Sequence, residues 1–253
     1  MSDLQDASVL ITGGGSGIGA ATAAYLAERG ARVTISGRRE AKVRQVAQAI
    51  GPACLAVTGD VTLAADRERM VAQAVAHGAG LDALVNNAGN MYRGELANLT
   101  EQGLLDIFNS NVISAMLLTG LCVEHLARND GAVVFLGSIH NRRAFPGASP
   151  YAATKGAIES ITRSFAAELG AQGVRVNCVA PGAVYTEINQ RAGLFNDEQA
   201  LKRLQGMSGL HALGRIGEAQ EVAQAIAYFI TAPWTTGTIL DVDGGLGLGL
   251  TEG

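Results

Sequence analysis

The feature that most constrains the fold is a regular alternation of short apolar runs with longer helix-patterned stretches along the chain. The runs are short and continuously apolar, which is typical of parallel strands covered on both faces. The stretches between them have the length that a helical crossover between parallel strands needs. We therefore predict an α/β fold, a doubly wound parallel sheet of about seven strands with helices on both faces. The predicted strands are Ser8–Ile11, Arg32–Ser36, Ala53–Val57, Ala83–Asn86, Ala132–Leu136, Arg175–Val179 and Thr238–Asp241.

Length and composition fit one domain. The chain has 253 residues, of which 48% are hydrophobic and 17% are charged, and this is enough for one sizeable core. No change of composition marks a linker, so we predict a single domain over residues 1–253. The longest irregular region begins at Gly182 and runs to about Asp197. Because long loops in compact domains are usually lids or binding loops, we expect this region to have such a role.

Charge and the scarcity of metal-ligand patterns exclude several classes of function. The net charge is −4 and the chain has no run of basic residues, which argues against nucleic acid or an anionic membrane as the main partner. The 3 cysteines and 4 histidines are scattered without ligand spacing, so no metal site is predicted. Cys54, Cys122 and Cys178 each lie in an apolar segment and are expected to be buried, inert thiols.

The N-terminal residues and the apolar segments predict where in the cell the protein is found. Residues 1–7 lack the basic and apolar regions of a signal peptide. No uncharged apolar stretch approaches the ~20 residues that a membrane span needs. Residues 104–126 come closest, but polar residues interrupt them, namely Asp106, Asn109, Asn111 and Glu124. We therefore expect a soluble, cytoplasmic protein.

A glycine-rich turn follows the first predicted strand. The segment Thr12-Gly13-Gly14-Gly15-Ser16-Gly17-Ile18-Gly19 stands between the apolar run 9–11 and a helix-patterned stretch over 20–29. Glycines allow a tight turn and close backbone approach, and a helix N-terminus favours the negative charge of a pyrophosphate. A plain glycine-rich turn is the alternative, but the flanking strand and helix favour a Rossmann-like dinucleotide site.

A tyrosine and a lysine four residues apart indicate acid–base chemistry. Tyr151 and Lys155 share one face of a predicted helix, and Ser138 lies thirteen residues before the tyrosine. An ammonium beside a phenol favours the phenolate, so the tyrosine can give or take a proton near neutrality. A half-buried aromatic beside a solvated lysine would explain this spacing in an arbitrary helix. The glycine turn far upstream favours the chemical interpretation.

Together these segments resemble the short-chain dehydrogenase/reductase family over nearly the whole chain. The turn at 12–19 matches that family's T-G-x-x-x-G-x-G, and Asn86-Asn87-Ala88-Gly89 matches its N-N-A-G. Residues 151–155 match Y-x-x-x-K, and residues 181–186 match P-G-x-x-x-T. The resemblance implies an oxidoreductase that interconverts a small-molecule ketone and a secondary alcohol with a nicotinamide cofactor. It also places a substrate lid at about 182–217.

The resemblance implies a role for each matching residue. Tyr151 would exchange a proton with the substrate, Lys155 would support its ionised form, and Ser138 would donate a hydrogen bond to the substrate oxygen. Asn111 would kink a long helix and anchor a water near Lys155. The residues expected to bind the cofactor are Gly13, Gly15, Ser16, Gly17, Ile18, Gly19, Arg38, Arg39, Asp60, Val61, Asn87, Ala88, Gly89, Tyr151, Lys155, Pro181, Gly182, Val184 and Thr186.

Cofactor choice depends on the end of the second predicted strand. An acidic residue there usually binds the ribose 2′-hydroxyl of NAD, but Gly37 occupies that place. Arg38 follows and could pair with a 2′-phosphate through its planar guanidinium, so we favour NADP(H) and keep NAD(H) as the alternative. NADP-dependent relatives often carry a basic residue in the glycine turn, where this chain has Ser16. The other interpretation of Arg38 and Arg39 is a solvated charge pair.

The polar segment after Ser138 bears on the substrate. In relatives that act on sugars or hydroxy acids, a histidine two residues after the serine can contact the substrate. His140 therefore suggests a polyhydroxylated or carboxylate-bearing ketone. The alternative is that His140, Arg142 and Arg143 belong to a surface loop or a subunit contact. Further candidates for the pocket are Met91, Tyr185 and Asn189.

Besides a dehydratase or epimerase that uses the same tyrosine, whose relatives tend to be longer, two other functions share these motifs. A 3-oxoacyl thioester reductase of fatty-acid type is the nearest enzymatic alternative, although the basic residues are dispersed and form no patch for an acidic carrier protein. The second is a catalytically silent NADP-binding sensor or scaffold. Such relatives typically lose the tyrosine or the lysine, and this chain has both. The resemblance also implies a homotetramer or homodimer formed through the long helices that contain Asn111 and Tyr151.

Overall fold

The computed structural model describes residues 3–188 and 196–249. Within these ranges, seven parallel strands form one sheet in the order β3-β2-β1-β4-β5-β6-β7. The strands are β1 (Ser8–Thr12), β2 (Arg32–Gly37), β3 (Cys54–Thr58), β4 (Ala83–Asn86), β5 (Ala132–Leu136), β6 (Arg175–Pro181) and β7 (Ile239–Val242). Each overlaps the strand predicted at the same place, so the predicted doubly wound parallel sheet is confirmed.

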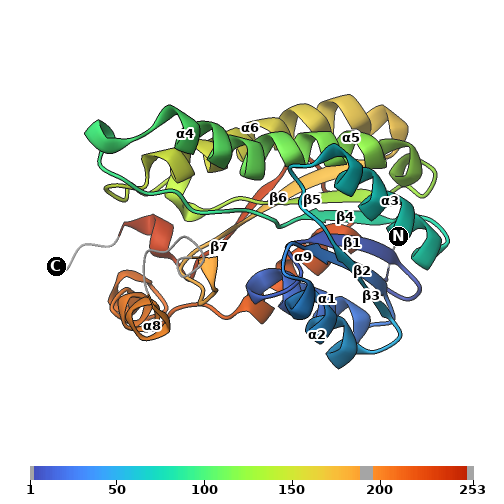
Figure 1. Cartoon of the computed structure of the whole chain (residues 1–253), viewed down its shortest axis with the longest axis horizontal. Helices are drawn as coiled ribbons and strands as arrows, with labels where there is room; N and C mark the ends of the chain where they lie inside the picture. The colour runs from blue at the N-terminus through green and yellow to red at the C-terminus, as the bar shows by residue number, and fades with distance from the viewer. Residues whose placement is uncertain (1–2, 189–195, 250–253) are drawn as a thin grey trace.

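Helices cover both faces of the sheet (Figure 1). On one face lie α1 (Gly17–Ala27), α2 (Glu40–Ile50) and α9 (Ala219–Thr231). On the other lie α3 (Ala64–Gly78), α4 (Glu101–Phe108), α5 (Ser114–Ala127) and α6 (Ser149–Leu169). A further helix, α8 (Asp197–Gln205), lies near one end of the molecule close to β7. Short 3-10 turns cover Leu96–Asn98, Ile139–Asn141, Gly170–Gln172, Ser208–Leu210 and Leu246–Leu248.

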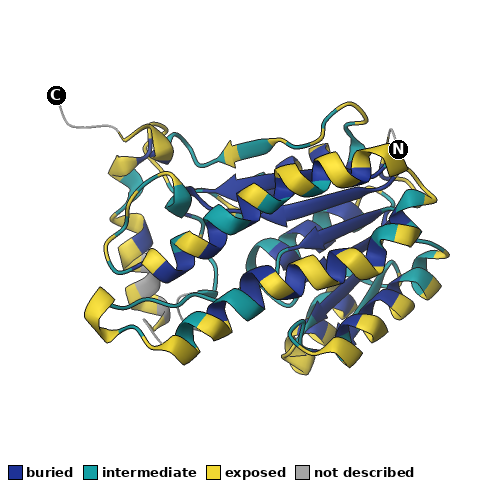
Figure 2. Ribbon diagram, turned by 90° about the horizontal axis from the view of Figure 1, so that it is seen from above, coloured by how far each residue is buried: buried dark blue, intermediate teal, exposed yellow. Residues whose placement is uncertain are grey.

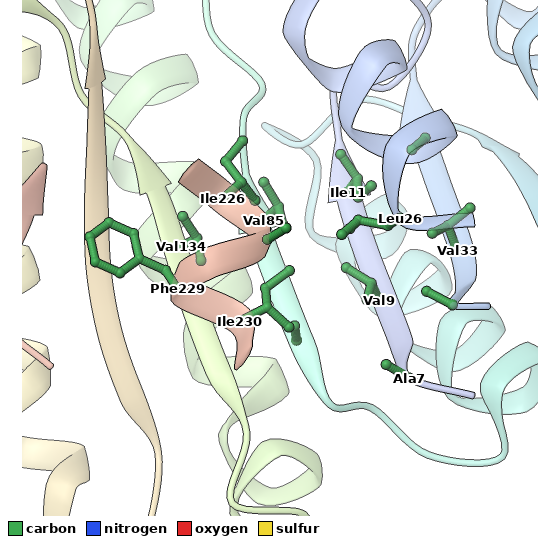
Figure 3. Close-up of a cluster of buried hydrophobic side chains, with 14 of the residues drawn as sticks. Ala7, Val9, Ile11, Leu26, Val33, Val85, Val134, Ile226, Phe229 and Ile230 are labelled. Atoms are coloured by element: carbon green, nitrogen blue, oxygen red, sulfur yellow. The ribbon is translucent and has the colours of Figure 1, made fainter. Parts of the chain in front are cut away.

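The strands are buried because their side chains alternate between two apolar layers. In β1, Val9 and Ile11 belong to the layer under α1 and α9, whereas Leu10 belongs to the layer under α3 and α5. Figure 3 shows the first layer, in which Phe229 and Ile230 of α9 lie over the sheet. Figure 2 shows buried positions along the strands and exposed positions along the outer sides of the helices. The sheet therefore holds the loops that follow its strands in fixed positions.

The strand order reverses between β1 and β4. Ligands of such sheets bind in the crevice outside the carboxyl ends of the strands at this switch point. Here the glycine turn after β1 meets the segment after β4, and the backbone N–H groups of Asn87 and Ala88 donate to Thr12 Oγ1 at 3.1 and 3.0 Å. The fold thus brings two of the sequence motifs together at the place where a dinucleotide is expected.

Residues 101–127 form one long helical stretch that includes α4, a π turn at Asn109–Ile113 and α5. By length and composition this stretch could cross a membrane, since an 18-residue window of it has a mean hydropathy of 1.4, but 44% of that window is buried inside the fold. Leu118 and Cys122 are fully buried in the core, and Asn86 donates to Thr119 Oγ1 at 3.0 Å. The stretch is therefore part of the helical layer that covers the sheet.

Candidate active site

A cleft opens at the carboxyl ends of the central strands. Its walls come from the glycine turn, the segments after β4, β5 and β6, the first turns of α6, and α8. Most of the predicted site residues line it. They are Gly13, Ser16, Gly17, Ile18, Asn87, Ala88, Gly89, Met91, Ser138, His140, Tyr151, Lys155, Pro181, Gly182, Val184 and Thr186.

Two smaller pockets lie over the ends of β2 and β3. Arg38, Asp60 and Val61 line one of them, and Arg38, Arg39 and Gly15 line the other. Arg38 donates to Asn90 Oδ1 at 3.4 Å, its guanidinium lies 3.9 Å from the Asp60 carboxylate, and its side chain is 57% exposed. The predicted residues for the adenosine end of a cofactor therefore gather around these pockets.

The glycine turn is braced from below by Asn87. The Asn87 Nδ2 donates to the carbonyl oxygens of Thr12 and Gly13 at 2.8 and 3.2 Å. Gly13 has φ +68°, and a Cβ on Gly19 would lie 2.5 Å from both Asn87 Nδ2 and the oxygen of Gly13. The turn and the N-terminus of α1 fit the pyrophosphate of a dinucleotide, because both offer backbone N–H groups without a Cβ in the way. Gly19 itself does not line the cleft and supports the turn from behind, which differs from its predicted role.

Tyr151 and Lys155 lie one turn apart on α6, and each is 7% exposed. The Lys155 Nζ donates to the carbonyl oxygen of Leu136, at the end of β5, at 2.7 Å. It lies 5.4 Å from the centre of the Tyr151 ring. The backbone of β5 thus holds the ammonium beside the phenol, and both side chains line the cleft as the spacing predicted.

The hydroxyl of Ser138 is held by His140. The Ser138 Oγ lies 3.1 Å from His140 Nδ1 and accepts from the His140 backbone N–H at 3.3 Å. The other ring nitrogen, Nε2, lies 3.3 Å from Arg93 Nη2. The imidazole meets the Tyr151 ring edge-on at 5.1 Å and the Phe145 ring at 4.4 Å between centroids. His140 therefore faces the cleft, and the surface-loop alternative does not hold for this residue.

Positive charge surrounds this imidazole. Burial, and then the charges of Arg93, Lys155 and Arg203, lower the pKa of His140 to about 4, so the ring is neutral at pH 7. Burial, followed by the charge of Arg203, also lowers the pKa of Arg93 below its usual value. The Nε of Arg93 is buried and has no hydrogen-bond partner within the described part of the chain. This wall of the cleft therefore offers a cationic donor to a bound molecule.

Arg142 and Arg143 tie the segment after β5 to other elements. Arg142 pairs with Asp241 of β7 and lies 3.6 Å from the carboxylate of Glu159 on α6. Arg143 donates to the carbonyl oxygen of Leu246 at 2.7 Å. Neither arginine is among the residues that line the cleft. Their contacts support a structural role within the fold.

Asn111 lies behind the cleft in the π turn and is 3% exposed. Its Oδ1 accepts from the backbone N–H of Asn90 at 2.8 Å, and its Nδ2 donates to the Asn90 carbonyl at 3.0 Å and to Thr154 Oγ1 at 3.2 Å. Asn111 thus links the loop after β4 to α6. The π turn is the predicted irregularity in the long helix, and the water relay to Lys155 stays a prediction.

The structure also corrects one pocket residue and adds others. Tyr185 does not line the cleft and is 41% exposed. Asn189 lies outside the described residues. The sequence patterns missed two arginines and several apolar residues that line the cleft, since all lie in loops or on faces without a motif. They are Arg93, Phe145, Arg203, Leu204, Met207 and Leu246.

The cysteines take no part in this site. Burial raises the pKa of all three thiols, Cys54, Cys122 and Cys178, to about 12. A thiol is a nucleophile only as its thiolate, so these groups are inert near neutrality. Cys122 and Cys178 are buried as predicted, whereas Cys54 is only partly buried. Across residues 3–188 and 196–249, no group of three or more histidine, cysteine or acidic side chains gathers in a way that could hold a metal ion.

The doubly wound sheet, the switch-point cleft and the Ser138, Tyr151 and Lys155 side chains define a nicotinamide-dependent oxidoreductase of Rossmann type. Comparisons with known proteins agree with this class. A family model described as enoyl-(acyl carrier protein) reductase matches residues 13–247. Glucose 1-dehydrogenase of Gluconobacter oxydans is 34% identical over 248 residues, which cover 95% of this chain and 91% of that protein. L-fucose dehydrogenase of Bos taurus is 33% identical over 95% of this chain and 89% of its own length.

Solved structures are similar over the same length. A 3-ketoacyl-(acyl-carrier-protein) reductase from Brucella melitensis, complexed with NADH, has a TM-score of 0.88 and 31% identity, and the match covers 96% of this chain and 99% of that one. A Caenorhabditis elegans short-chain dehydrogenase/reductase with cofactor has a TM-score of 0.91 and 27% identity, covering 98% and 97%. The chain belongs to the short-chain dehydrogenase/reductase family. It is an NAD(P)-dependent enzyme that acts on carbonyl and alcohol groups.

Proposed function

We propose that this enzyme uses NADP(H) to interconvert a ketone and a secondary alcohol on a small substrate with a carboxylate or several hydroxyl groups close to the carbonyl. One observation carries the proposal. Ser138 and Tyr151 face the same cleft as a cationic wall formed by Arg93 and Arg203. We place the reaction in the cytoplasm as part of the same proposal.

Arg38 supports the choice of NADP(H). It stands between the two pockets over the ends of β2 and β3, and Gly37 provides no carboxylate for a ribose 2′-hydroxyl. Its neighbour Arg39 forms an ion pair with Glu187 at 2.6 Å. An exposed, planar guanidinium beside the ribose is suited to a 2′-phosphate. Arg38, with Arg39 on the other side of the pocket, would hold that group.

The residues of the cleft can perform the proton transfer. When bound, the reduced nicotinamide supplies the hydride. The Tyr151 phenol gives its proton to the carbonyl oxygen as charge builds on it, and the Ser138 hydroxyl donates a hydrogen bond to the same oxygen. Lys155, fixed by the carbonyl of Leu136 at 2.7 Å, keeps a positive charge near the phenolate that remains. In the oxidative direction, Tyr151 takes the alcohol proton.

The position of Arg93 supports an anionic group close to the carbonyl. Only one imidazole separates Arg93 from Ser138, with contacts of 3.3 and 3.1 Å at its two nitrogens. An oxo acid would therefore place its carboxylate at the Arg93 guanidinium, which lines the cleft, while Ser138 binds its carbonyl oxygen. The apolar residues of the wall would contact the hydrocarbon part. They are Phe145, Leu204, Met207 and Leu246.

A 3-oxoacyl thioester reductase is the second candidate. The similar structure from Brucella melitensis favours it, the description of the matching family model also names an acyl carrier protein, and the same apolar wall suits an acyl chain. In such a substrate the nearest anion is the phosphate of the prosthetic arm that links the thioester to its carrier protein. That phosphate would lie too far from the carbonyl to reach Arg93, so Arg93 favours the first candidate. A silent sensor is disfavoured, because Tyr151 and Lys155 both face the cleft.

The test follows oxidation of NADPH, and separately of NADH, with neutral ketones, keto sugars, short oxo acids and 3-oxoacyl thioesters. We expect oxo acids or keto sugars to be reduced fastest. Tyr151→Phe should lower kcat by about 10²–10⁴-fold and still bind NADPH, since the glycine turn and Arg38 are intact. Tyr228→Phe, at an exposed position on α9, is the matched control. Full activity of Tyr151→Phe would overturn the mechanism, and a preference for thioesters would establish the second candidate.

A further inference from the structure

Three side chains form a line that ends at the serine of the site. Arg93 follows β4, whereas His140 lies in the 3-10 turn after β5. Arg93 Nη2 lies 3.3 Å from His140 Nε2, and His140 Nδ1 lies 3.1 Å from Ser138 Oγ. The imidazole therefore bridges the guanidinium and the hydroxyl, with one ring nitrogen toward each.

The chemistry of arginine decides which ring nitrogen carries the proton. A guanidinium has N–H donors and no acceptor, and it keeps its charge near neutrality. Its contact with Nε2 therefore requires Nε2 to be the acceptor. A neutral imidazole has a single N–H, so the proton of His140 lies on Nδ1. That N–H points at Ser138 Oγ and donates to it.

The direction of this bond determines what the serine can do. Ser138 Oγ then accepts two hydrogen bonds, one from His140 Nδ1 and one from the His140 backbone N–H at 3.3 Å. With both acceptor positions of the oxygen filled, the hydroxyl hydrogen is left to point at a substrate oxygen. We propose that Arg93 and His140 are positioning residues that fix Ser138 as a hydrogen-bond donor to the substrate.

The hydrogen bonds that run from Arg93 through His140 to Ser138 form a relay. The surroundings of the imidazole support the neutral state that this relay needs. Arg93, Lys155 and Arg203 act on it as cations from three different elements, and the Tyr151 and Phe145 rings lie against it. A second proton on the ring would also face the N–H groups of Arg93. The pKa of about 4, caused first by burial and then by the three cations, keeps the ring neutral over the pH range in which the enzyme would be assayed.

The opposite tautomer would have the opposite effect. With the proton on Nε2, the lone pair of Nδ1 would accept from Ser138, and the hydroxyl hydrogen would turn away from the substrate. Two donors would then meet between Nε2 and Arg93. The role of Ser138 as a donor to the substrate rests on the proposed function. The tautomer of His140 can be measured without any substrate.

The first test is ¹⁵N NMR of the histidine-labelled protein at pH 7. His140 is assigned by the signals lost in His140→Asn. We expect a protonated Nδ1 and an unprotonated Nε2 in the wild type and in Arg93→Lys, which keeps a donor. Arg93→Met should move the proton toward Nε2, whereas Arg128→Met, at an exposed position directly after α5, should change nothing. An Nε2–H tautomer in the wild type would overturn the proposal, even if Arg93→Met does not fold.

The second test is a double-mutant cycle on the turnover of a neutral ketone, so that direct binding of an anion by Arg93 plays no part. Arg93→Met should lower kcat about tenfold with little change in KM, and Arg93→Lys should restore most of the loss. In a Ser138→Ala background, Arg93→Met should cause no further loss, because the relay acts only through the serine. Equal losses in both backgrounds would contradict the relay. Absence of all turnover would overturn the proposed function and leave the NMR result to decide the tautomer.

Discussion

At the scale of single residues, the cleft is unusual in combining a neutral imidazole with several cations. His140 lies between Arg93 and Ser138 and close to Lys155. A protonated ring would have no acceptor left for Arg93, and its charge would be buried away from water. The structure therefore keeps this histidine uncharged at a pH where a solvent-exposed histidine would begin to protonate.

This arrangement predicts a pH dependence of stability. The folded His140 has a pKa of about 4 against an ordinary value of 6.5, so between these values the unfolded chain binds a proton that the folded chain does not. Stability should therefore fall as the pH drops from 6.5 toward 4, by about 2 kcal/mol at pH 5 from this residue alone. Above pH 6.5 the contribution should be constant.

Urea unfolding at pH 7.5 and pH 5.0 measures the effect. His140→Asn has no group that titrates in this range, so its free energy of unfolding should depend less on pH than that of the wild type. The difference between the two proteins should be about 2 kcal/mol over the interval. An identical pH dependence in both would show that His140 does not titrate as described.

A second residue-scale prediction concerns the cofactor. Arg38→Ala should weaken NADPH binding by about 10-fold to 100-fold, since a hydrogen bond to a charged group contributes about 1.5–3 kcal/mol. NADH has no 2′-phosphate, so its affinity should stay the same. Fluorescence titration with both cofactors measures this, and Arg44→Ala is the control because Arg44 pairs with Glu40 on the exposed side of α2. Equal losses for both cofactors would refute the assignment of Arg38.

At the scale of elements, a buried arginine of β6 closes the C-terminal end of α9. Arg175 is 8% exposed and donates to the carbonyl oxygens of Phe229, Ile230 and Ala232 at 2.6, 2.7 and 2.9 Å. The last carbonyls of a helix have no partner within the helix. The strand thus supplies the cap that α9 lacks, and it ties the helix to the sheet.

Removal of this cap should destabilise the fold. Arg175→Met leaves buried carbonyls without donors and should cost about 2–4 kcal/mol in the free energy of unfolding. Arg163→Met, at an exposed position on α6, should change it by less than about 0.5 kcal/mol. Chemical denaturation of the two variants distinguishes them. Equal stabilities would show that the three contacts contribute little.

At the scale of the whole molecule, the long helical stretch of residues 101–127 presents large apolar side chains to solvent. Ile113, Leu117 and Leu121 are spaced four residues apart and so share one face. The exposed apolar residues of this stretch are Leu105, Ile113, Met116, Leu117 and Leu121. Such a contiguous exposed apolar face favours association. It supports the proposal of a homodimer or homotetramer.

A charge on this face should disrupt the assembly. Leu117→Glu would place a carboxylate inside the interface, where burial without a partner is unfavourable. We expect analytical ultracentrifugation to show an oligomer for the wild type and a smaller species for Leu117→Glu. Leu63→Glu, at an exposed apolar position just before α3, should leave the assembly intact. A monomeric wild type would contradict the proposal.

Much of the fold and part of the site could be predicted from local patterns. Strands bury alternate side chains on two faces and helices repeat every 3.6 residues, so both leave a periodic trace in the sequence. Ser138, Tyr151 and Lys155 were predicted together because a motif marks them. Tyr185 was not placed correctly, since the irregular segment after β6 has no period that shows which side chain faces the cleft.

The sequence by itself determined the parallel sheet, the glycine turn and the shared face of the tyrosine and lysine on α6. Each of these leaves a local pattern in the sequence, either a periodicity of apolar residues or a short motif. Only the tertiary structure decided that Arg93 meets His140, and that the same imidazole meets Ser138. The physical reason is that these residues lie in loops after two different strands. Their distance depends on how β4 and β5 pair in the finished sheet, and no local period records it.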